Sequence, residues 1–303
     1  MNEPLAYFNG SIIPASQAAI SVADAGFVQG TTVAEQMRTF GGKLFRLESH
    51  VQRLMRSLAI VGVDPGLSQA QLVGIAQELA KENHRLLDPA DDLGMAMFVT
   101  PGLYGPMSSS WAGPTACLHT FPLRFSLWAD KYEAGQSLVT TGVVQIAQHA
   151  WPRELKCRSR MHYYLADRQA AAREPQSRAL LLDEDGYVME TTTSNLVIFD
   201  REAGLLMPPG DKVLPGISLA VLIELADGLR VTHVERELRP ADVAAADEVW
   251  ITSTSPCILP VVRFNGQPIG SGAPGATYRR FLAAWSDLVG LDVAAQAARF
   301  ASR

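Results

Sequence analysis

A predicted β-hairpin in the second half of the chain constrains the fold more than any other segment. Residues 179–182 are apolar, a turn of acidic residues and glycine follows at 183–186, and residues 187–190 return as a second strand. Residues 195–199 predict a further strand directly afterwards. The second half is therefore expected to contain a β-sheet.

The rest of the second half mixes helices with strands. The sequence predicts a helix over residues 161–173 and another that opens at the loop 214–218 and ends near residue 228. Residues 248–252 are typical of a buried strand, and a final helix is expected to begin near residue 276. No internal repeat is visible among these elements.

A hairpin and three further strands are predicted in the first half. Residues 7–13 predict a hairpin around an Asn-Gly turn, and residues 32–39 predict an extended stretch that ends at a Gly-Gly turn. Residues 95–100 and 115–121 have the apolar composition of buried strands.

Two helices lie between these strands in the sequence. Apolar residues recur at helical spacing over residues 47–58, and Gly62 ends the pattern, so Arg53 is placed on a helix beside the buried stripe. Ser68 and Gln71 form a predicted capping box before the second helix. Strands combined with helices in this way indicate an α+β fold.

The length of the chain suggests two domains. With 303 residues and 48% hydrophobic composition, the chain can bury a substantial core. We expect a smaller N-terminal domain over residues 1–122, a linker over residues 123–130 and a larger C-terminal domain over residues 131–303.

Charge and cysteine content narrow the functional class. The net charge of −5 is spread along the chain without a block of like charges, so neither a nucleic acid nor a membrane surface is an expected partner. The N-terminus lacks the pattern of a secretory signal, and no stretch is long and apolar enough to span a bilayer. The three cysteines, Cys117, Cys157 and Cys257, lie far apart and indicate reduced thiols, neither a disulfide framework nor a zinc site. These features predict a soluble, cytoplasmic enzyme that acts on small molecules.

An ordered series of motifs points to a family. Lys156 precedes an amphipathic helix, and three segments follow it in order: the hairpin ALLLDEDGYVMETTTSNLVIF, then VLPGISLAVLIELA, then EVWITSTSPCILPV. The first half contains DAGFVQGTTVAEQMRTFGGKLFRLESHVQRLMRSL, with a His-x-x-Arg-Leu element at residues 50–54. Together they resemble the class IV (fold-type IV) aminotransferases, which depend on pyridoxal 5′-phosphate (PLP) and include branched-chain and D-amino-acid aminotransferases and aminodeoxychorismate lyase.

The resemblance implies roles for two ionisable residues. Lys156 is the expected Schiff-base lysine, because a deprotonated amine can bind the PLP aldehyde covalently and later move a proton between the substrate Cα and the cofactor C4′. Glu190 is the expected partner of the pyridine nitrogen, since a carboxylate there keeps the nitrogen protonated and the ring electron-withdrawing.

A phosphate dianion needs several donors and a positive charge, and the resemblance assigns residues to both tasks. Arg53 supplies the cation. Ile217 and Ser218, at the start of a helix, supply backbone N–H and hydroxyl donors, and Thr254 contributes from the TSTS loop. Thr193 is expected to line the same pocket.

Two residues are expected to contact the substrate. Ala34 stands where branched-chain and D-amino-acid aminotransferases carry a bulky aromatic residue before a glutamate, so the pocket should be roomier. Ser255 occupies the position whose backbone N–H helps to bind the substrate carboxylate in branched-chain enzymes. Pro256, which has no N–H, follows it here.

The chain departs from the family pattern in two further places. D-amino-acid aminotransferases carry an Arg-x-His element after the strand that ends V-T-x-G, whereas residues 103–111 here contain none. Many members have an Asn-Tyr pair after the lysine whose phenol approaches the cofactor's O3′. This chain has Ser159 and Arg160 there, with Tyr163 and Tyr164 further on. The substrate and its stereochemistry stay open.

The leading hypothesis is a PLP-dependent aminotransferase that passes an amino group from an amino acid or amine to an oxo acid or ketone by a ping-pong mechanism. An alternative is an enzyme like aminodeoxychorismate lyase, which uses the same cofactor but releases pyruvate. A third possibility is a PLP-binding protein that has lost catalysis. The resemblance also implies a homodimer.

Overall fold

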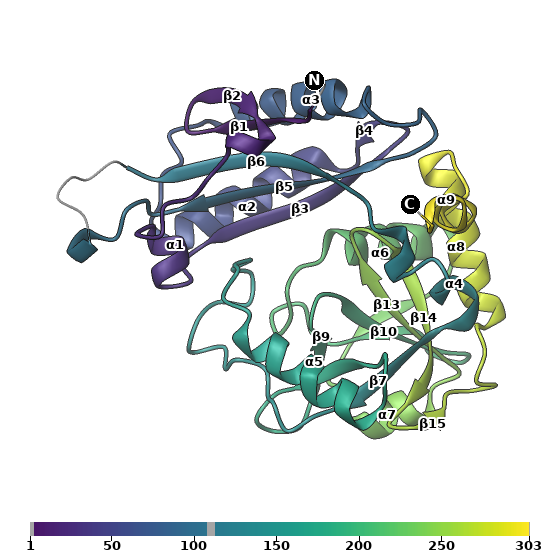
Figure 1. The fold of residues 1–303 in the computed structure, drawn as a ribbon. Helices are drawn as coiled ribbons and strands as arrows, with labels where there is room; N and C mark the ends of the chain where they lie inside the picture. The colour runs from purple at the N-terminus through teal and green to yellow at the C-terminus, as the bar shows by residue number, and fades with distance from the viewer. Residues whose placement is uncertain (1–2, 108–112, 303) are drawn as a thin grey trace. The chain divides into compact units, whose positions relative to one another are not determined.

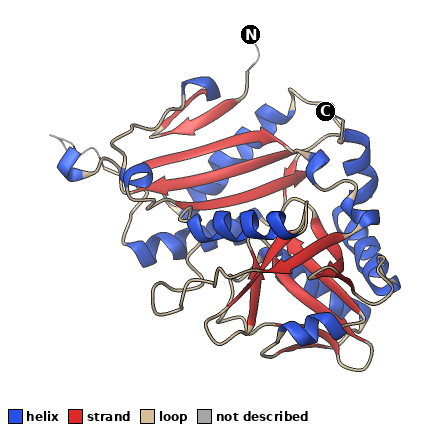
Figure 2. Cartoon of the chain, turned by 60° about the horizontal axis from the view of Figure 1, so that its bottom comes forward, coloured by secondary structure: helices blue, strands red, loops and turns tan. Residues whose placement is uncertain are grey.

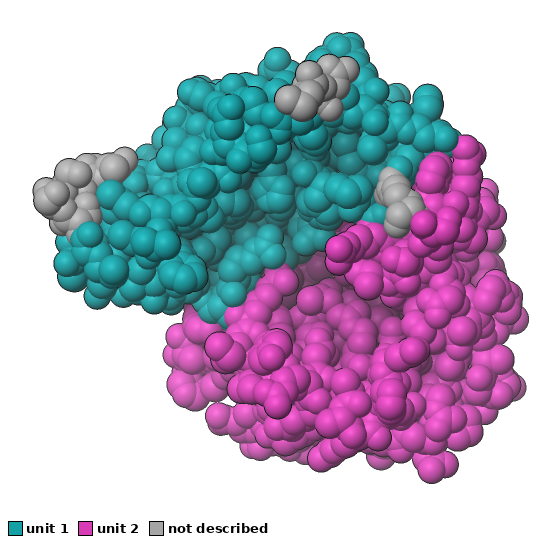
Figure 3. All heavy atoms as spheres, in the orientation of Figure 1, with its two compact units in different colours: residues 1–123, 155–159 teal, residues 124–154, 160–303 magenta. Residues whose placement is uncertain are grey.

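The computed structural model describes residues 3–107 and 113–302. The chain divides into two compact units (Figure 3). Unit 1 comprises Met1–Leu123 and Leu155–Ser159, and unit 2 comprises Arg124–Glu154 and Arg160–Arg303. The short return of the chain to unit 1 was not part of the sequence-based division. It carries the predicted cofactor lysine, Lys156.

Unit 1 contains a six-stranded antiparallel sheet in the order β2-β1-β6-β5-β3-β4 (Figures 1 and 2). Both arms of the predicted hairpin and the three further strands predicted in the first half are present. Asn9 and Gly10 form the hairpin turn with positive φ angles of 46° and 93°. The strands are β1 (Leu5–Phe8), β2 (Ser11–Pro14), β3 (Val33–Phe40), β4 (Lys43–Leu44), β5 (Leu93–Thr100) and β6 (Thr115–Pro122).

Helices α2 (Leu47–Val61) and α3 (Gln69–His84) cover one face of this sheet (Figure 1). Both predicted helix signals are confirmed: Gly62 ends α2 in the left-handed conformation, and Ser68 and Gln71 form a capping box. The core between helices and sheet is built from apolar residues of both layers, including Val33 and Met37 of β3. A short helix, α1 (Ala25–Val28), precedes β3.

Unit 2 contains a nine-stranded mixed sheet in the order β12-β11-β10-β13-β14-β7-β8-β9, with β15 paired to β14. Because β9 also pairs with β10, the strands β10, β13, β14, β7, β8 and β9 form a closed ring of pairs. The strands are β7 (Gln136–Thr140), β8 (Arg178–Leu182), β9 (Val188–Thr191), β10 (Asn195–Asp200), β11 (Gly204–Met207), β12 (His233–Glu235), β13 (Glu248–Ser253), β14 (Cys257–Phe264) and β15 (Gln267–Pro268).

The predicted helices of the second half are also present. They are α5 (Met161–Arg173), which packs on β7 and β8, α6 (Ile217–Leu229), which packs on β13, and α8 (Ala276–Val289). Unit 2 also contains the α-helices α4 (Lys131–Ala134), α7 (Pro240–Ala245) and α9 (Val293–Phe300) and the 3-10 helix Phe125–Leu127. Within the part of the chain that the structure describes, no helix has the length and apolar character needed to cross a membrane.

Candidate functional site

In unit 1, backbone pairing fixes the position of Lys156. The segment Leu155–Ser159 runs antiparallel to the start of β3, and the Ala34 backbone N donates to the Lys156 carbonyl oxygen over 3.1 Å. The backbone N of Lys156 donates to the Ser57 hydroxyl at 3.1 Å, and Ser57 is fully buried in α2. A strand and a helix therefore both hold the backbone of this lysine.

Beside this segment lies a buried cluster of ionisable side chains. Glu35 shares a face of β3 with the core residues Val33 and Met37, so its side chain points toward α2. Its carboxylate accepts hydrogen bonds from Arg53 Nε at 2.7 Å and from Arg53 Nη2 at 2.9 Å. His50 Nδ1 lies 2.9 Å from the same carboxylate. Arg53, expected to be the phosphate cation, is thus a buried residue with a bidentate acidic partner.

The charges in this cluster favour an ionised glutamate and a neutral histidine. Burial raises the Glu35 pKa, but the Arg53 charge, hydrogen bonds from Arg53 and His50, and the Lys156 charge outweigh burial and lower it to about 2. Burial lowers the His50 pKa and, together with the charges of Arg53 and Lys156, outweighs the hydrogen bond and the charge of Glu35, which raise it. Neutral His50 must then donate its Nδ1 proton to Glu35.

Ala34 lies on the other side of β3. Successive side chains of a strand point to opposite faces, so the Ala34 methyl group points away from the face that carries Glu35. Ala34 is almost fully buried.

In unit 2, two neutral donors hold the Glu190 carboxylate. Glu190 is buried in β9, and its Oε1 accepts from Gln145 Nε2 at 2.7 Å and from the Tyr163 hydroxyl at 3.1 Å. Burial and the Glu190 charge raise the Tyr163 pKa, so this phenol keeps its proton and donates. The arrangement stabilises an ionised carboxylate.

Asn195 joins Glu190 to the start of α6. It pairs with Glu190 between β10 and β9, and its side-chain Nδ2 donates to the Leu214 carbonyl oxygen at 2.9 Å. A Cβ atom on Gly216 would lie only 1.9 Å from Asn195 Oδ1, so the approach requires glycine at this position. Ile217 and Ser218 follow Gly216 as the first residues of α6.

The turn after β13 also lies close to this region. The Ser253 hydroxyl donates to the Thr193 carbonyl oxygen at 3.1 Å, which ties the turn that contains Thr254 and Ser255 to the β9–β10 connection. The Thr193 hydroxyl accepts a hydrogen bond from Arg178. Unit 2 therefore brings together the segments that carry Glu190, Thr193, Ile217, Ser218, Thr254 and Ser255.

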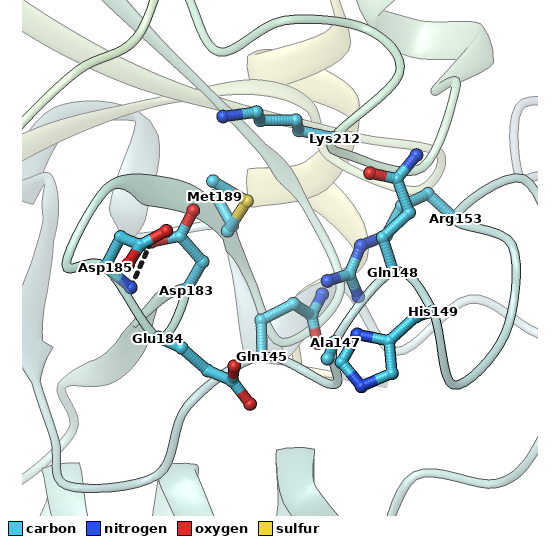
Figure 4. Close-up of a pocket in the computed structure, with 10 residues that line it drawn as sticks. All are labelled: Gln145, Ala147, Gln148, His149, Arg153, Asp183, Glu184, Asp185, Met189 and Lys212. Carbon is cyan, nitrogen blue, oxygen red and sulfur yellow. Dashed lines mark hydrogen bonds between the residues drawn. The ribbon is translucent and has the colours of Figure 1, made fainter.

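A cavity of about 220 Å³ borders Gln145 (Figure 4). Arg153, Met189 and Lys212 line it with the acidic turn that begins at Asp183. Burial lowers the Arg153 pKa, opposed by nearby charges that include Glu190 and Asp183. Gln145 therefore stands between the Glu190 carboxylate and this cavity.

Sequence reasoning missed Glu35 and Gln145 as parts of the candidate site. Glu35 had a detectable signal, because a charged residue stands there between two core positions of a predicted strand. Gln145 is a neutral residue after β7, and its partners are distant in sequence, so no local pattern marks it. Residues 108–111 of the segment without an Arg-x-His element lie outside the described residues.

A Glu35→Gln substitution should destabilise unit 1 in a pH-dependent manner. The change leaves Arg53 buried without its counter-charge, which costs roughly 3–5 kcal/mol near neutral pH. Because folding lowers the Glu35 pKa from 4.5 to about 2, its charge stabilises the native state fully above pH 4.5 and loses this effect as the pH falls toward 2. Urea unfolding at a series of pH values should show the deficit of the variant narrowing by about 3 kcal/mol over this range.

Glu48→Gln is the matched control, since Glu48 is exposed in the first turn of α2, the helix that carries Arg53. Its unfolding free energy should follow the wild-type curve. A deficit of the Glu35 variant that is independent of pH would contradict the assigned charge state.

Comparison with known proteins places the chain in a family. The model of the family "Amino-transferase class IV" matches residues 32–264, which is more than half of the chain. A D-alanine aminotransferase of Bacillus licheniformis is 30% identical over 271 residues, 88% of this chain and 91% of that protein. A putative branched-chain-amino-acid aminotransferase of Methanocaldococcus jannaschii is 27% identical over 284 residues, covering 93% of this chain and 95% of its own.

Solved structures show the same fold. The branched-chain amino acid aminotransferase of Escherichia coli has a TM-score of 0.86 at 24% identity, covering 96% of this chain and 95% of its own. A second branched-chain amino acid aminotransferase (T.th.), solved with pyridoxamine 5′-phosphate, has a TM-score of 0.85 at 23% identity with the same coverage. These relatives favour transamination over the lyase alternative. The chain therefore belongs to the class IV aminotransferases and is a PLP-dependent transaminase of fold type IV.

Proposed function

We propose that this enzyme passes an amino group from a small amino acid to an oxo acid, with Lys156 as the covalent anchor of PLP and Glu190 as the partner of the ring nitrogen. The observation that carries the assignment is the buried Glu190 carboxylate, which Gln145 and Tyr163 hold with two hydrogen bonds. An ionised carboxylate in such a place suits a protonated pyridine nitrogen.

The remaining donors suit the phosphate. Gly216 caps α6 without a side-chain hydrogen bond among the described residues, so no capping side chain satisfies the first N–H groups of the helix. We assign Ile217, Ser218 and Thr254 as phosphate donors in unit 2, with Thr193 lining the pocket. Arg53 is the proposed cation in unit 1, where Glu35 fixes the plane of its guanidinium.

Each residue then has a separate task. When bound, PLP supplies an electron-withdrawing ring that lowers the cost of negative charge on the donor's Cα. The Lys156 amine takes the proton from that Cα and delivers it to C4′ of the cofactor. Glu190 holds the proton on the ring nitrogen throughout.

The substrate class is narrowed by the relatives and by two residues. The relatives are named for D-alanine and for branched-chain amino acids, which are small apolar substrates. Ala34 leaves more room than the bulky aromatic residue that branched-chain and D-amino-acid aminotransferases carry at this position. Ser255 is the proposed contact for the substrate carboxylate. We therefore propose an amino acid donor with an apolar side chain.

We also propose a homodimer in which a second copy covers an apolar patch of unit 1. The patch comprises Ile20, Val22, Phe27 and Val28, and the Val22 and Phe27 side chains are 77% and 74% exposed. Large apolar residues gathered in this way favour a protein interface. The cytoplasmic location and the domain limits expected from the sequence stay predictions.

Borohydride reduction of the holoenzyme should attach the cofactor to Lys156. Peptide mapping by mass spectrometry should find the label on this residue, and Lys156→Ala should lower the transamination rate by at least about 1000-fold, since it loses both the anchor and the proton carrier. Lys81→Ala, an exposed change on α3, is the control and should keep full activity. A label on any other lysine would refute the assignment.

Gly216→Ala should weaken PLP binding. The added Cβ would meet Asn195 Oδ1, so either the loop or Asn195 must shift, and the hydrogen bond to Leu214 is disturbed. Titration of the apoenzyme with PLP should show a dissociation constant raised by about 10-fold, which corresponds to the loss of one hydrogen bond.

Gly228→Ala is the matched control within the same helix, because a Cβ there meets nothing within 4 Å. It should leave PLP affinity unchanged and raise stability by up to about 1 kcal/mol. Equal affinities for the two variants would show that the Asn195 contact does not shape the phosphate site.

Phe27→Glu should convert the dimer to monomer. A charge among these exposed apolar residues would have to lose its hydration when a second copy packs on them. Sedimentation equilibrium should give the mass of two chains for the wild type and of one chain for the variant. Val234→Glu, at an exposed apolar residue of unit 2, should remain dimeric. A dimeric Phe27 variant would place the interface elsewhere.

A further inference from the structure

Gln145 occupies a fixed place beside Glu190. It is 3% exposed, and its backbone N donates to the Leu182 carbonyl oxygen at 2.8 Å, at the end of β8. Its side-chain Nε2 lies 2.7 Å from Glu190 Oε1. We propose that Gln145 is a positioning residue that holds the Glu190 carboxylate ionised and correctly oriented for the ring nitrogen. The inference rests on the proposed role of Glu190.

The amide of Gln145 can face Glu190 in one way only. Its Oε1 accepts from the Ile146 backbone N at 3.1 Å and lies 3.0 Å from His162 Nε2. A backbone N–H can only donate, so the amide oxygen must lie on that side. The NH₂ group is therefore the one directed at Glu190.

His162 secures this orientation. Because Gln145 Oε1 is an acceptor, the Nε2 atom of His162 must carry the proton. Burial and the charges of Arg153 and Arg160 lower the His162 pKa to about 4, so the ring is neutral near pH 7 and places no cation beside the amide. His162 thus fixes Gln145, and Gln145 fixes Glu190.

The two donors on Glu190 come from different elements. Tyr163 donates from α5, whereas Gln145 donates from the segment that follows β7. Both bind Oε1, which limits rotation of the carboxylate about its last torsion. Hydrogen bonds to a charged acceptor stabilise the ionised form over the protonated one. Loss of the Gln145 amide should therefore make the Glu190 carboxylate easier to protonate and freer to rotate.

The neighbouring cavity allows Gln145 to be substituted. Because Gln145 lines a cavity of about 220 Å³, a methionine of similar length can replace it without a steric clash. Gln145→Met removes the donor and the acceptor of the amide. Gln145→Glu keeps the size but sets a second carboxylate against Glu190, and serves as the second variant if methionine unfolds the segment.

Both variants should be compared with the wild-type holoenzyme in three measurements. The rate of the first half-reaction should fall about 10- to 100-fold, the factor for a hydrogen bond to a charged group. The pH midpoint of the cofactor's visible absorbance should shift in both variants, because Gln145→Met removes a donor that stabilises the Glu190 charge and Gln145→Glu adds a second carboxylate beside it. The PLP dissociation constant of the apoenzyme should change less than about 3-fold, since the proposed phosphate donors lie in other segments.

Gln148→Met is the matched control. Gln148 follows in the same segment, but it is exposed and its amide donates to the Asp211 carbonyl oxygen at 3.2 Å. All three measurements should match the wild type. If Gln145→Met and Gln145→Glu also match the wild type, the proposal is wrong.

A double-mutant cycle separates this proposal from the one on which it rests. If Gln145 acts through Glu190, adding Gln145→Met to Glu190→Gln should cost less than about 3-fold in rate. A full additional loss would overturn the inference, because the glutamine would then act by another route. If Glu190→Gln alone retains the wild-type rate and absorbance, the proposed role of Glu190 fails and the inference fails with it.

Discussion

The antiparallel pairing of Leu155–Ser159 with β3 is the constraint that fixes Lys156 in unit 1. Two donors act there in opposite directions: β3 gives an N–H to Lys156, and Lys156 gives its own N–H to Ser57 of α2. In the proposed role of Lys156, the amine of a long, flexible side chain must return to one place in each half-reaction, which requires a fixed backbone. These hydrogen bonds fix the backbone of Lys156, and β3 also carries Glu35.

The buried carboxylates of Glu35 and Glu190 have different kinds of hydrogen-bond partner. Glu35 is matched by a cation, and burial is offset by the bidentate bond with Arg53. Glu190 accepts hydrogen bonds from two neutral side chains, Gln145 and Tyr163, and its charge also acts on Arg153. Neutral donors stabilise a carboxylate without cancelling its charge, whereas the bidentate arginine neutralises most of the charge of Glu35. This contrast agrees with the proposal that Glu190 faces a protonated nitrogen and that Glu35 orients an arginine.

Much of the fold was predictable because its signals are local. The helix α2 and its glycine cap, the capping box of α3, the hairpin at Asn9 and the strands β8 to β10 all follow from periodicity and turn residues over a few positions. The strand β14 was not predicted, since Pro260 stands inside it and a proline normally argues against a strand interior. Here Pro260 is the partner of Trp250.

The candidate site was predictable only in part. The order of motifs suggested Lys156 and Glu190 as site residues, because this order follows the order of the structural elements along the chain. Their roles stay predictions. Gln145 could not be identified from the sequence, because its hydrogen-bond partners His162 and Glu190 are 17 and 45 positions away. Only the folded chain brings these partners together.

The return of Leu155–Ser159 to unit 1 has a consequence for how the gene can be divided. A cut between Leu123 and Arg124 would leave the first fragment without the segment that pairs with the start of β3. The second fragment would carry Lys156 on a segment that has lost its strand partner. The two units are therefore neither separable modules nor interchangeable parts, and recombination that swaps one of them must carry this five-residue segment across with unit 1.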